Sequence, residues 1–459
     1  MAALPKVSAA EQLASAFHTG TGAAPVLPAR VGEMCDTLLM ELTGLCVAAR
    51  NTDYVEAALR ATSESGACTL IGHAGGFNPA TAALVNGTAA HGEDYDDTFE
   101  GGPVHTGAVI VPAVLVAVEQ HGLGGADLLR GISVGCEVMC RLCLVAPMRV
   151  HKTGFHPTAV FGALGAAAGV ASALRLTQAQ WVQALGIAGS MAGGIIEYLA
   201  EGAWVKRMHP GWAAQAGYRA ARMAQAGFTG PRTVLDGEHG LFYAFANTRD
   251  GNFAAMLDGA GSQWLCADVA FKPYACGTMA HPFIDCARKL VAEGVRPDDI
   301  TSIECETAEG IVHRLWEPLA AKQAPPNGYA AKFSIPYAIA VGMLRDDAGL
   351  NDYEEAVVHD PAVRALAAKV RYVVDPDNPY PKKFIGHVRV TLRDGTVREA
   401  RQAYFRGGKD KPLARTDLEA KFRANCVYGG WTPDQASAAL ALLRSAPAAG
   451  RVDLTSLRA

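Results

Sequence analysis

Small residues at helical spacing dominate the chain as far as about residue 260. Ala, Leu, Gly and Met recur there with few alternating β-branched residues, and Gly or Pro separates the segments. Because small side chains let helix backbones approach closely, this pattern favours a tightly packed bundle over an exposed solenoid. Capping boxes formed by Thr177 with Gln180, and by Thr432 with Gln435, predict two helix starts. The pattern therefore predicts a large helical domain.

The pattern changes from about Phe271 onward. Apolar and polar residues alternate with period two in residues 303–307, 369–375 and 388–392. This alternation is typical of strands that bury one face, so it predicts a sheet. Helical patterning then returns, and we expect the C-terminal segment to pack back on the first domain.

The predicted fold class is therefore mainly α, a large all-helical domain built from both chain ends with an inserted smaller α+β domain. We expect every strand to lie within 300–405. The expected bounds are 1–270 completed by 406–459 for the helical domain, and 271–405 for the inserted domain.

Composition and charge exclude several classes of protein. Apolar residues make up 50% of the chain and charged residues 19%, a balance that allows a large buried core. The net charge of −4 provides no general positive field for nucleic acid or an anionic membrane. The apolar stretches 107–118 and 161–174 are shorter than the ~20 residues of a membrane span. We expect no nucleic-acid partner and no membrane partner.

The eleven cysteines are scattered through apolar stretches, which predicts reduced thiols in the cytosol. The N-terminal segment reads as a short amphipathic helix and lacks the apolar core of a secretory signal, so we expect a cytoplasmic protein. Cys136, Cys140 and Cys143 have the CxxxCxxC spacing of a radical-SAM iron–sulfur site. They lie in one continuous helical pattern and share a helix face, which favours ordinary core packing.

The densest polar constellation runs from His91 to His105 and includes Asp94, Asp96 and Asp97. A carboxylate and an imidazole beside a helix start suit proton transfer, because the surroundings can tune each pKa. Two alternatives remain open. The acidic residues cap helices while His105 is simply packed, or the five residues bind a metal, although no HExxH-like helical pair fixes that geometry.

Positive and titratable residues gather in further segments, and together they suit the binding of two or three substrate carboxylates. Lys206, Arg207 and His209 lie within four residues, a pattern that also fits a solvated bend between helices. The remaining candidates stand near the expected domain junction or at the start of apolar helices: Lys272, His281, Lys332 and His156.

Several blocks, in this order, resemble the MmgE/PrpD family, whose members include 2-methylcitrate dehydratase, cis-aconitate decarboxylase and iminodisuccinate epimerase. The blocks span about residues 85–345 and read HGEDYDDTF, GFHPTA, KRMHPGWAAQAG, FKPYACGTMAHPFID and KFSIPYAIAVGML. The resemblance implies a helical domain built from both termini, an inserted α+β domain, a homodimer, and catalysis without metal or organic cofactor.

The resemblance also places family-type active-site residues on nine positions. It implies catalytic roles for Asp94, Thr98, His105 and His156, and substrate-binding roles for Lys206, His209, Lys272, His281 and Lys332. One departure is the loop before His105, which Gly101-Gly102-Pro103 lengthens, and His-Thr-Gly replaces the more usual His-Pro-Gly.

Family chemistry takes place at a carbon next to a carboxylate, so it needs an acid–base pair and fixed positive charge. We expect His105 and Asp94 to be that pair, Thr98 and His156 to orient a small di- or tricarboxylate, and the lysines to hold its carboxylates. The first expectation is a hydro-lyase similar to 2-methylcitrate dehydratase. The alternatives are an epimerase or a decarboxylase of a related polycarboxylate, and a carboxylate-binding scaffold without turnover.

Overall fold

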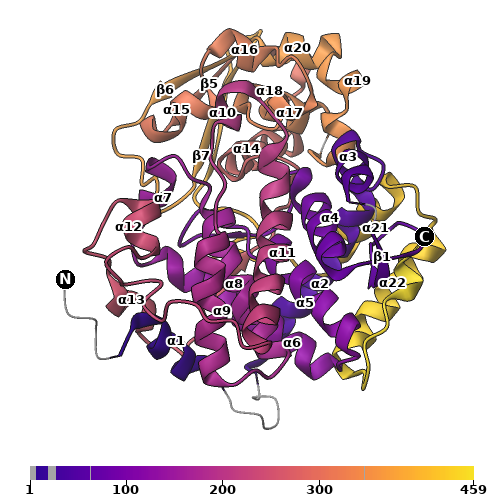
Figure 1. Ribbon diagram of the computed structural model, residues 1–459. Helices are drawn as coiled ribbons and strands as arrows, with labels where there is room; N and C mark the ends of the chain where they lie inside the picture. The colour runs from indigo at the N-terminus through magenta and orange to yellow at the C-terminus, as the bar shows by residue number, and fades with distance from the viewer. Residues whose placement is uncertain (1–6, 19–26, 63, 346, 459) are drawn as a thin grey trace. The chain divides into compact units, whose positions relative to one another are not determined.

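The computed structural model describes residues 7–18, 27–62, 64–345 and 347–458 (Figure 1). It is mainly helical, and the chain divides into two compact units. The first unit contains Met1–Gly92, Asp96–Val269 and Arg415–Ala459, and the second contains Glu93–Tyr95 and Ala270–Ala414.

The first unit is a helical assembly with short strands near its start and end. Its helices are α1 (Ala9–Phe17), α2 (Ala29–Ala49), α3 (Asp53–Ala61), α4 (Pro79–Gly92), α5 (Gly107–His121), α6 (Gly125–Cys143), α7 (Arg149–Lys152), α8 (Pro157–Ala173), α9 (Gln178–Met191), α10 (Tyr198–Glu201), α11 (Val205–Gln225), α12 (Leu241–Ala246), α13 (Phe253–Leu257), α21 (Arg415–Tyr428) and α22 (Pro433–Ser445). Its short strands are β1 (Ser65–Thr69), β2 (Gly76–Phe77) and β3 (Thr98–Phe99), while β4 (Val269–Ala270) lies where the first unit ends.

Small residues give the first unit its close helix packing, as the sequence pattern predicts. All residues of α8 are buried, and this helix packs against α6 and α11. At the contact of α4 with α11, a Cβ atom on Gly211 would stand 1.9 Å from the Leu84 carbonyl oxygen, so only glycine fits. The two helix starts at Thr177 and Thr432 are confirmed, since each hydroxyl accepts the backbone N–H of the glutamine three residues later.

The C-terminal segment returns to the first unit through α21, which packs along α2. A buried ion pair fastens this contact, because the Lys421 ammonium binds the Glu41 carboxylate with both side chains almost fully buried. The first unit is therefore assembled from both ends of the chain.

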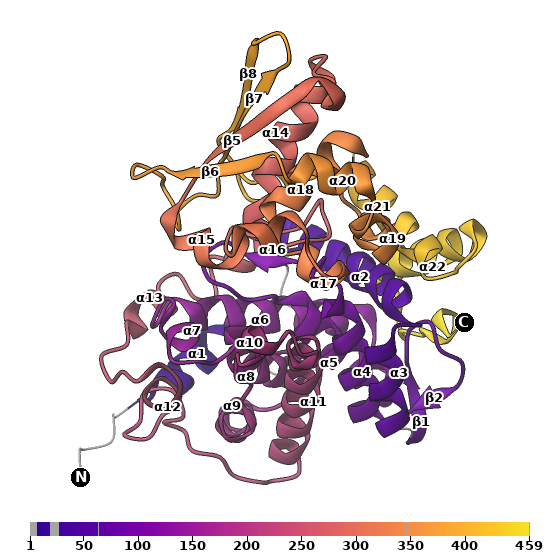
Figure 2. The same ribbon diagram turned by 90° about the horizontal axis from the view of Figure 1, so that it is seen from above.

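The second unit contains the larger sheet, with strands in the order β6-β5-β7-β8 (Figure 2). β5 runs parallel to β6 and antiparallel to β7, and β7 is antiparallel to β8. Helix α14 packs against β7, β8 and α18. The elements of this unit are α14 (His281–Ala292), β5 (Ile300–Thr307), α15 (Glu309–Leu315), α16 (Leu319–Gln323), α17 (Gly328–Ala331), α18 (Ile335–Leu344), α19 (Glu355–Val358), α20 (Pro361–Ala367), β6 (Val370–Val374), β7 (Gly386–Leu392) and β8 (Val397–Gln402).

One expectation from the sequence is wrong, and one of the two interpretations left open is excluded. Strands are not confined to 300–405, because β1 and β2 pair antiparallel near residue 70. That pairing depends on the close approach of Gly66 and Gly76. The sequence has no alternation of apolar and polar residues there that would predict a strand. The Lys206–Gly211 segment is no bend between helices, because it forms the first turns of α11. There the burial of Pro210 and Gly211 against neighbouring helices outweighs local propensity.

The three closely spaced cysteines, Cys136, Cys140 and Cys143, lie on α6 and are buried. Burial raises the pKa of each thiol, and all three side chains lie on one continuous, buried helix, as ordinary core residues do. Core packing is therefore the better interpretation. Among the described helices, none combines the length and the apolarity that crossing a membrane requires.

Candidate active site

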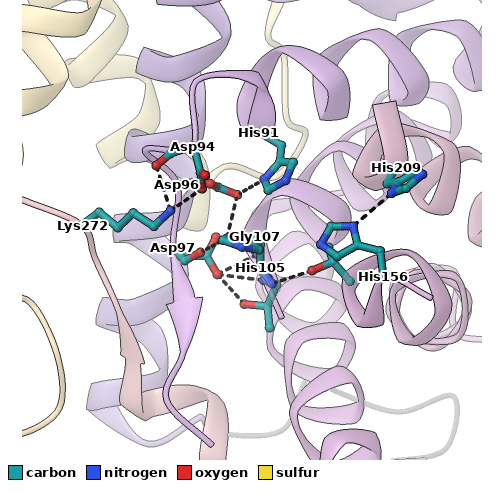
Figure 3. Close-up of polar contacts among 11 residues, drawn as sticks. His91, Asp94, Asp96, Asp97, His105, Gly107, His156, His209 and Lys272 are labelled. Carbon is teal, nitrogen blue, oxygen red and sulfur yellow. Dashed lines mark hydrogen bonds and ion pairs between the residues drawn. The ribbon is translucent and has the colours of Figure 1, made fainter. Parts of the chain in front are cut away.

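A buried carboxylate shared by two imidazoles lies at the centre of the site in the first unit (Figure 3). The Asp96 Oδ2 atom is 2.8 Å from His91 Nδ1 and 3.4 Å from His105 Nδ1. His91 comes from the last turn of α4, and His105 stands two residues before α5. The two rings meet edge to face, with centroids 4.6 Å apart. The end of one helix and the start of the next therefore bring both imidazoles to one carboxylate.

Asp97 holds the start of α5 and the ring of His105. Its carboxylate accepts the backbone N–H groups of Thr106 and Gly107, each at 2.9 Å, so Asp97 does cap a helix. Its carbonyl oxygen is 2.7 Å from His105 Nδ1. Because a carbonyl oxygen only accepts, the hydrogen of His105 lies on Nδ1. The Nε2 atom of His105 is left to exchange a proton.

The charge states follow from burial and from these contacts. Burial would raise the pKa of Asp96, but His91 and His105 hold it well below its usual value, so Asp96 is ionised at neutral pH. Burial lowers the pKa of His91 to about 4 against the opposing effect of Asp96, so His91 is neutral. A neutral His91 therefore donates its Nδ1–H to Asp96. Burial and the charge of Asp96 raise the pKa of Asp97.

Two more histidines extend the array within the first unit. His156, which precedes α8, has its Nδ1 3.1 Å from Nδ1 of His209 on α11, so one ring donates and the other accepts. The ring centroids of His91 and His156 are 6.0 Å apart, and Tyr198 packs edge-on against His156 and His209. Burial lowers the pKa of His209 to about 4 and that of His156 well below its usual value.

Lys206 belongs electrostatically to this histidine array. It lies in the first turn of α11, one turn before His209. Its positive charge contributes to the lowered pKa values of His91, His156 and His209. Arg207 points elsewhere, because its guanidinium stacks over the Tyr54 ring at 4.4 Å.

Two candidate lysines form ion pairs within the second unit. The Lys272 ammonium lies 2.7 Å from Asp94 Oδ1, and the Lys332 ammonium lies 2.8 Å from Glu93 Oε2. Both ammonium groups also bind the backbone carbonyl of the same acidic residue. Asp94 adopts a left-handed φ of 54°, which is unusual for a residue other than glycine. Each lysine therefore already has a protein carboxylate as its partner.

His281 and Thr98 are both buried. His281 begins α14, and its Nε2 lies 3.1 Å from the Cys276 carbonyl oxygen. Its ring packs against Tyr274 and Phe405. Thr98 lies on the short strand β3 of the first unit.

The structure thus brings His105, His156, His209 and Lys206 into one array in the first unit. Asp94, Lys272, Lys332 and His281 belong to the second unit. Sequence reasoning assigned no role to Glu93, although it lies within the HGEDYDDTF block, and none to Tyr198. The sequence analysis included His91 and Asp96 in the polar segment from His91 to His105 but assigned them no roles, because their contact depends on the turn after α4.

Of the five candidate metal ligands, the structure brings three together among the residues that it describes. His91, Asp96 and His105 each offer one ligand atom, and these atoms lie within 4.8 Å of one another. Two imidazole nitrogens and one carboxylate oxygen form a donor set that several divalent metals accept. The same atoms make the hydrogen bonds described above, so the two arrangements are alternatives for one cluster.

Two protein-family models match most of the chain. The MmgE/PrpD N-terminal domain matches residues 13–254, and the MmgE/PrpD C-terminal domain matches residues 274–442. The chain belongs to the MmgE/PrpD family, which confirms the resemblance seen in the sequence.

The chain is also similar to named proteins. It is 33% identical to cis-aconitate decarboxylase of Mus musculus over 362 residues, which cover 76% of this chain and 72% of the mouse protein. Cis-aconitate decarboxylase of Homo sapiens is 33% identical over 360 residues, with the same coverage of 76% and 72%. The mitochondrial 2-methylcitrate dehydratase of Yarrowia lipolytica is 30% identical over 115 residues, only 23% of this chain and 20% of that protein.

The buried pair of Lys272 with Asp94 leads to a prediction about stability. Lys272→Ala leaves an ionised, buried Asp94 without its ammonium partner, so we expect the free energy of unfolding to fall by about 3 kcal/mol. Urea unfolding followed by circular dichroism measures the change. As a matched control, Asp94→Asn combined with Lys272→Met removes both charges and should recover part of the loss. Unchanged stability in Lys272→Ala would contradict the ion pair.

The buried histidines lead to a prediction about acid. The pKa values of His91 and His209 are about 4 in the folded protein, below the ~6.5 of an unfolded histidine. Between these two pH values the unfolded chain binds more protons than the folded protein does. The free energy of unfolding is therefore highest above about pH 6.5 and falls as the pH drops toward 4. Urea midpoints at four pH values measure this slope.

His209→Asn should flatten the slope, because it removes one of the groups that titrate. His313→Asn, which removes an exposed imidazole on α15, is the matched control. Stability that does not change between pH 7 and pH 4.5, or an equal slope in both variants, would show that these rings are not held neutral by burial.

Proposed function

We propose that this protein is a decarboxylase of a small tricarboxylate such as cis-aconitate. The observation that carries the proposal is the long similarity to the mouse and human cis-aconitate decarboxylases, over 76% of this chain. The similarity to a 2-methylcitrate dehydratase extends over only 23% of the chain. The proposal therefore departs from the hydro-lyase that the sequence motifs favoured.

The reaction sets two physical requirements. When the carboxylate of the CH₂ arm of cis-aconitate leaves as CO₂, its bonding electrons form a new double bond to the central carbon. The electrons of the original double bond then move to the carbon next to the carboxylate at the far end. The double bond shifts, and the carbon next to that carboxylate takes up one proton. A site for this reaction needs positive charge near the substrate carboxylates and one acid that delivers the proton.

His105 suits the role of the acid. The Asp97 carbonyl binds its Nδ1–H, and the Asp96 carboxylate lies 3.4 Å from the same nitrogen, where it stabilises positive charge on the ring. The His105 side chain is 13% exposed, whereas that of His91 is 1% exposed. His105 is therefore the ring of this pair that a substrate can reach. In its protonated form it delivers the proton from Nε2 and keeps the hydrogen on Nδ1.

Lys206, His156 and His209 suit the binding of carboxylates. Of the two neutral imidazoles, the ring that accepts the bond between them keeps its Nε2–H for a substrate carboxylate, and Lys206 supplies one positive charge beside the pair. Within this proposal, Asp96 and His91 position His105. Roles for Asp94, Thr98, Lys272, His281 and Lys332 stay predictions from the family resemblance.

Turnover of defined substrates tests the proposal. The purified protein is dialysed against a chelator and incubated separately with cis-aconitate, citrate and 2-methylcitrate, while NMR follows products and a coupled assay follows CO₂. We expect CO₂ only from cis-aconitate, at a rate that the chelator does not change. Loss of water from 2-methylcitrate without CO₂ would support the dehydratase instead. Binding without any product would support a scaffold, and activity restored only by added metal would support the metal alternative.

The role of His105 has its own test. In His105→Asn the amide mimics the Nδ1–H that binds the Asp97 carbonyl, but no group replaces Nε2. We expect kcat to fall at least about 10²-fold with an unchanged melting temperature, because the proton donor is lost. His313→Asn is the matched control and should retain full activity. Near-normal turnover by a folded His105→Asn protein would remove His105 from the mechanism.

A further inference from the structure

The turn that follows α4 is attached to the second unit at three successive residues. The Lys332 ammonium binds the carbonyl oxygen of Glu93 at 2.7 Å and its carboxylate at 2.8 Å. The Lys272 ammonium binds the same two groups of Asp94 (Figure 3). The Tyr95 hydroxyl donates a hydrogen bond of 3.0 Å to the backbone carbonyl of the residue after Lys272. We call these three residues the 93–95 turn, and they belong to the second unit together with their partners.

The 93–95 turn connects two residues of the candidate active site. His91 lies two residues before the turn, Asp96 follows it directly, and His91 Nδ1 donates to Asp96 Oδ2 at 2.8 Å. Residues five apart on a continuous helix do not face each other as residues three or four apart do. Because α4 ends at Gly92, the path of the turn brings the two side chains together. The hydrogen bond between His91 and Asp96 therefore depends on the conformation of the 93–95 turn.

That conformation needs support from its surroundings. Asp94 has a φ of 54°, in the left-handed region that residues other than glycine rarely adopt. A backbone conformation of this kind persists only where neighbouring contacts hold it in place. The contacts of Lys332 with Glu93 and of Tyr95 with the second unit lie on either side of Asp94. Loss of one of them should let the turn relax.

The Lys332 ammonium has its partners within the second unit. Two of its three hydrogens bind Glu93, and the ring of Tyr353 lies 5.4 Å from the ammonium. The side chain of Lys332 is 3% exposed and that of Glu93 is 14% exposed. The Glu93 carboxylate balances the positive charge at close range, so little attraction remains for a substrate carboxylate.

We propose that Lys332 and Glu93 are positioning residues, whose ion pair holds the 93–95 turn so that His91 and Asp96 meet. This role differs from the substrate-binding role that the family resemblance implies for Lys332. The effect passes along the chain, because Glu93 is two residues from His91. Since Asp96 also faces His105, a displaced turn would misplace the proton donor. Only this effect on turnover rests on the proposed function.

The Nδ1 hydrogen of His91 tests the positioning role without substrate. Long-range ¹H–¹⁵N NMR of protein labelled on histidine nitrogen observes this hydrogen, and the spectrum of His91→Asn assigns its signal. We expect the signal in the native protein and its loss in Lys332→Met. Lys369→Met is the matched control, because the Lys369 ammonium holds a different backbone carbonyl of the second unit, that of Ile300, at 2.6 Å. It should keep the His91 signal.

A double variant separates positioning from stability. Lys332→Met leaves the Glu93 carboxylate without its partner, so the free energy of unfolding should fall. Glu93→Met combined with Lys332→Met removes both charges and should recover much of that stability, yet the His91 signal should stay absent because the turn is still unattached. With cis-aconitate as substrate, both variants should lower kcat about 10²-fold at an unchanged KM.

Two results would overturn the proposal. One is a His91 signal that survives in Lys332→Met. The other is a higher KM with an unchanged kcat, which would assign Lys332 to a substrate carboxylate instead. If the native protein does not act on cis-aconitate, the proposed function fails, and the His91 signal alone then decides whether Lys332 holds the turn.

Discussion

The site depends on one buried interaction, the sharing of the Asp96 carboxylate by His91 and His105. A fully buried carboxylate stays ionised only if hydrogen bonds replace the water it has lost. His91 Nδ1 donates such a bond to Asp96 Oδ2 at 2.8 Å, and His105 Nδ1 lies 3.4 Å from the same oxygen, whereas Oδ1 has no hydrogen-bond partner among the described residues. The same contacts fix the orientation of both rings and leave each Nε2 away from the carboxylate. Asp97 adds a second restraint on His105, because its carbonyl binds the ring and its carboxylate holds the start of α5.

The small residues of the first unit explain how these groups come to lie together. His91 stands at the end of α4, His156 just before α8, and His209 in the early turns of α11. These helix ends converge because α4 and α11 approach as closely as glycine allows at Gly211. A Gly- and Ala-rich composition therefore serves the chemistry as well as the core, since it brings imidazoles from separate helices within contact of one another.

Short-range signals predicted much of this structure. The capping boxes at Thr177 and Thr432 and the strands β5, β6 and β7 depend on residues a few positions apart, and the structure confirms them. The pairing of β1 with β2 depends on distant neighbours, and there the prediction from the sequence is wrong. The course of α11 through Pro210 also depends on distant neighbours, so the sequence left a bend open at that position.

The site shows the same division. His91, Asp96, Asp97 and His105 lie within one short segment, so their proximity was predictable. The ion pairs of Lys272 with Asp94 and of Lys332 with Glu93 join residues more than 170 positions apart. The sequence treated both lysines as binders of substrate carboxylates, because nothing near them reveals a protein partner. The sequence analysis also favoured dehydration over decarboxylation. The family motifs could not correct this choice, because members with different reactions share them.

The hydrogen positions on His91 and His105 test the central interaction most directly. Long-range ¹H–¹⁵N NMR of protein labelled on histidine nitrogen locates the hydrogens, and the spectra of His91→Asn and His105→Asn assign the signals. At neutral pH we expect hydrogen on Nδ1 of both rings and a bare Nε2 on His91, whose pKa is about 4. A hydrogen on Nε2 with a bare Nδ1 in either ring would contradict the shared carboxylate and the account built on it.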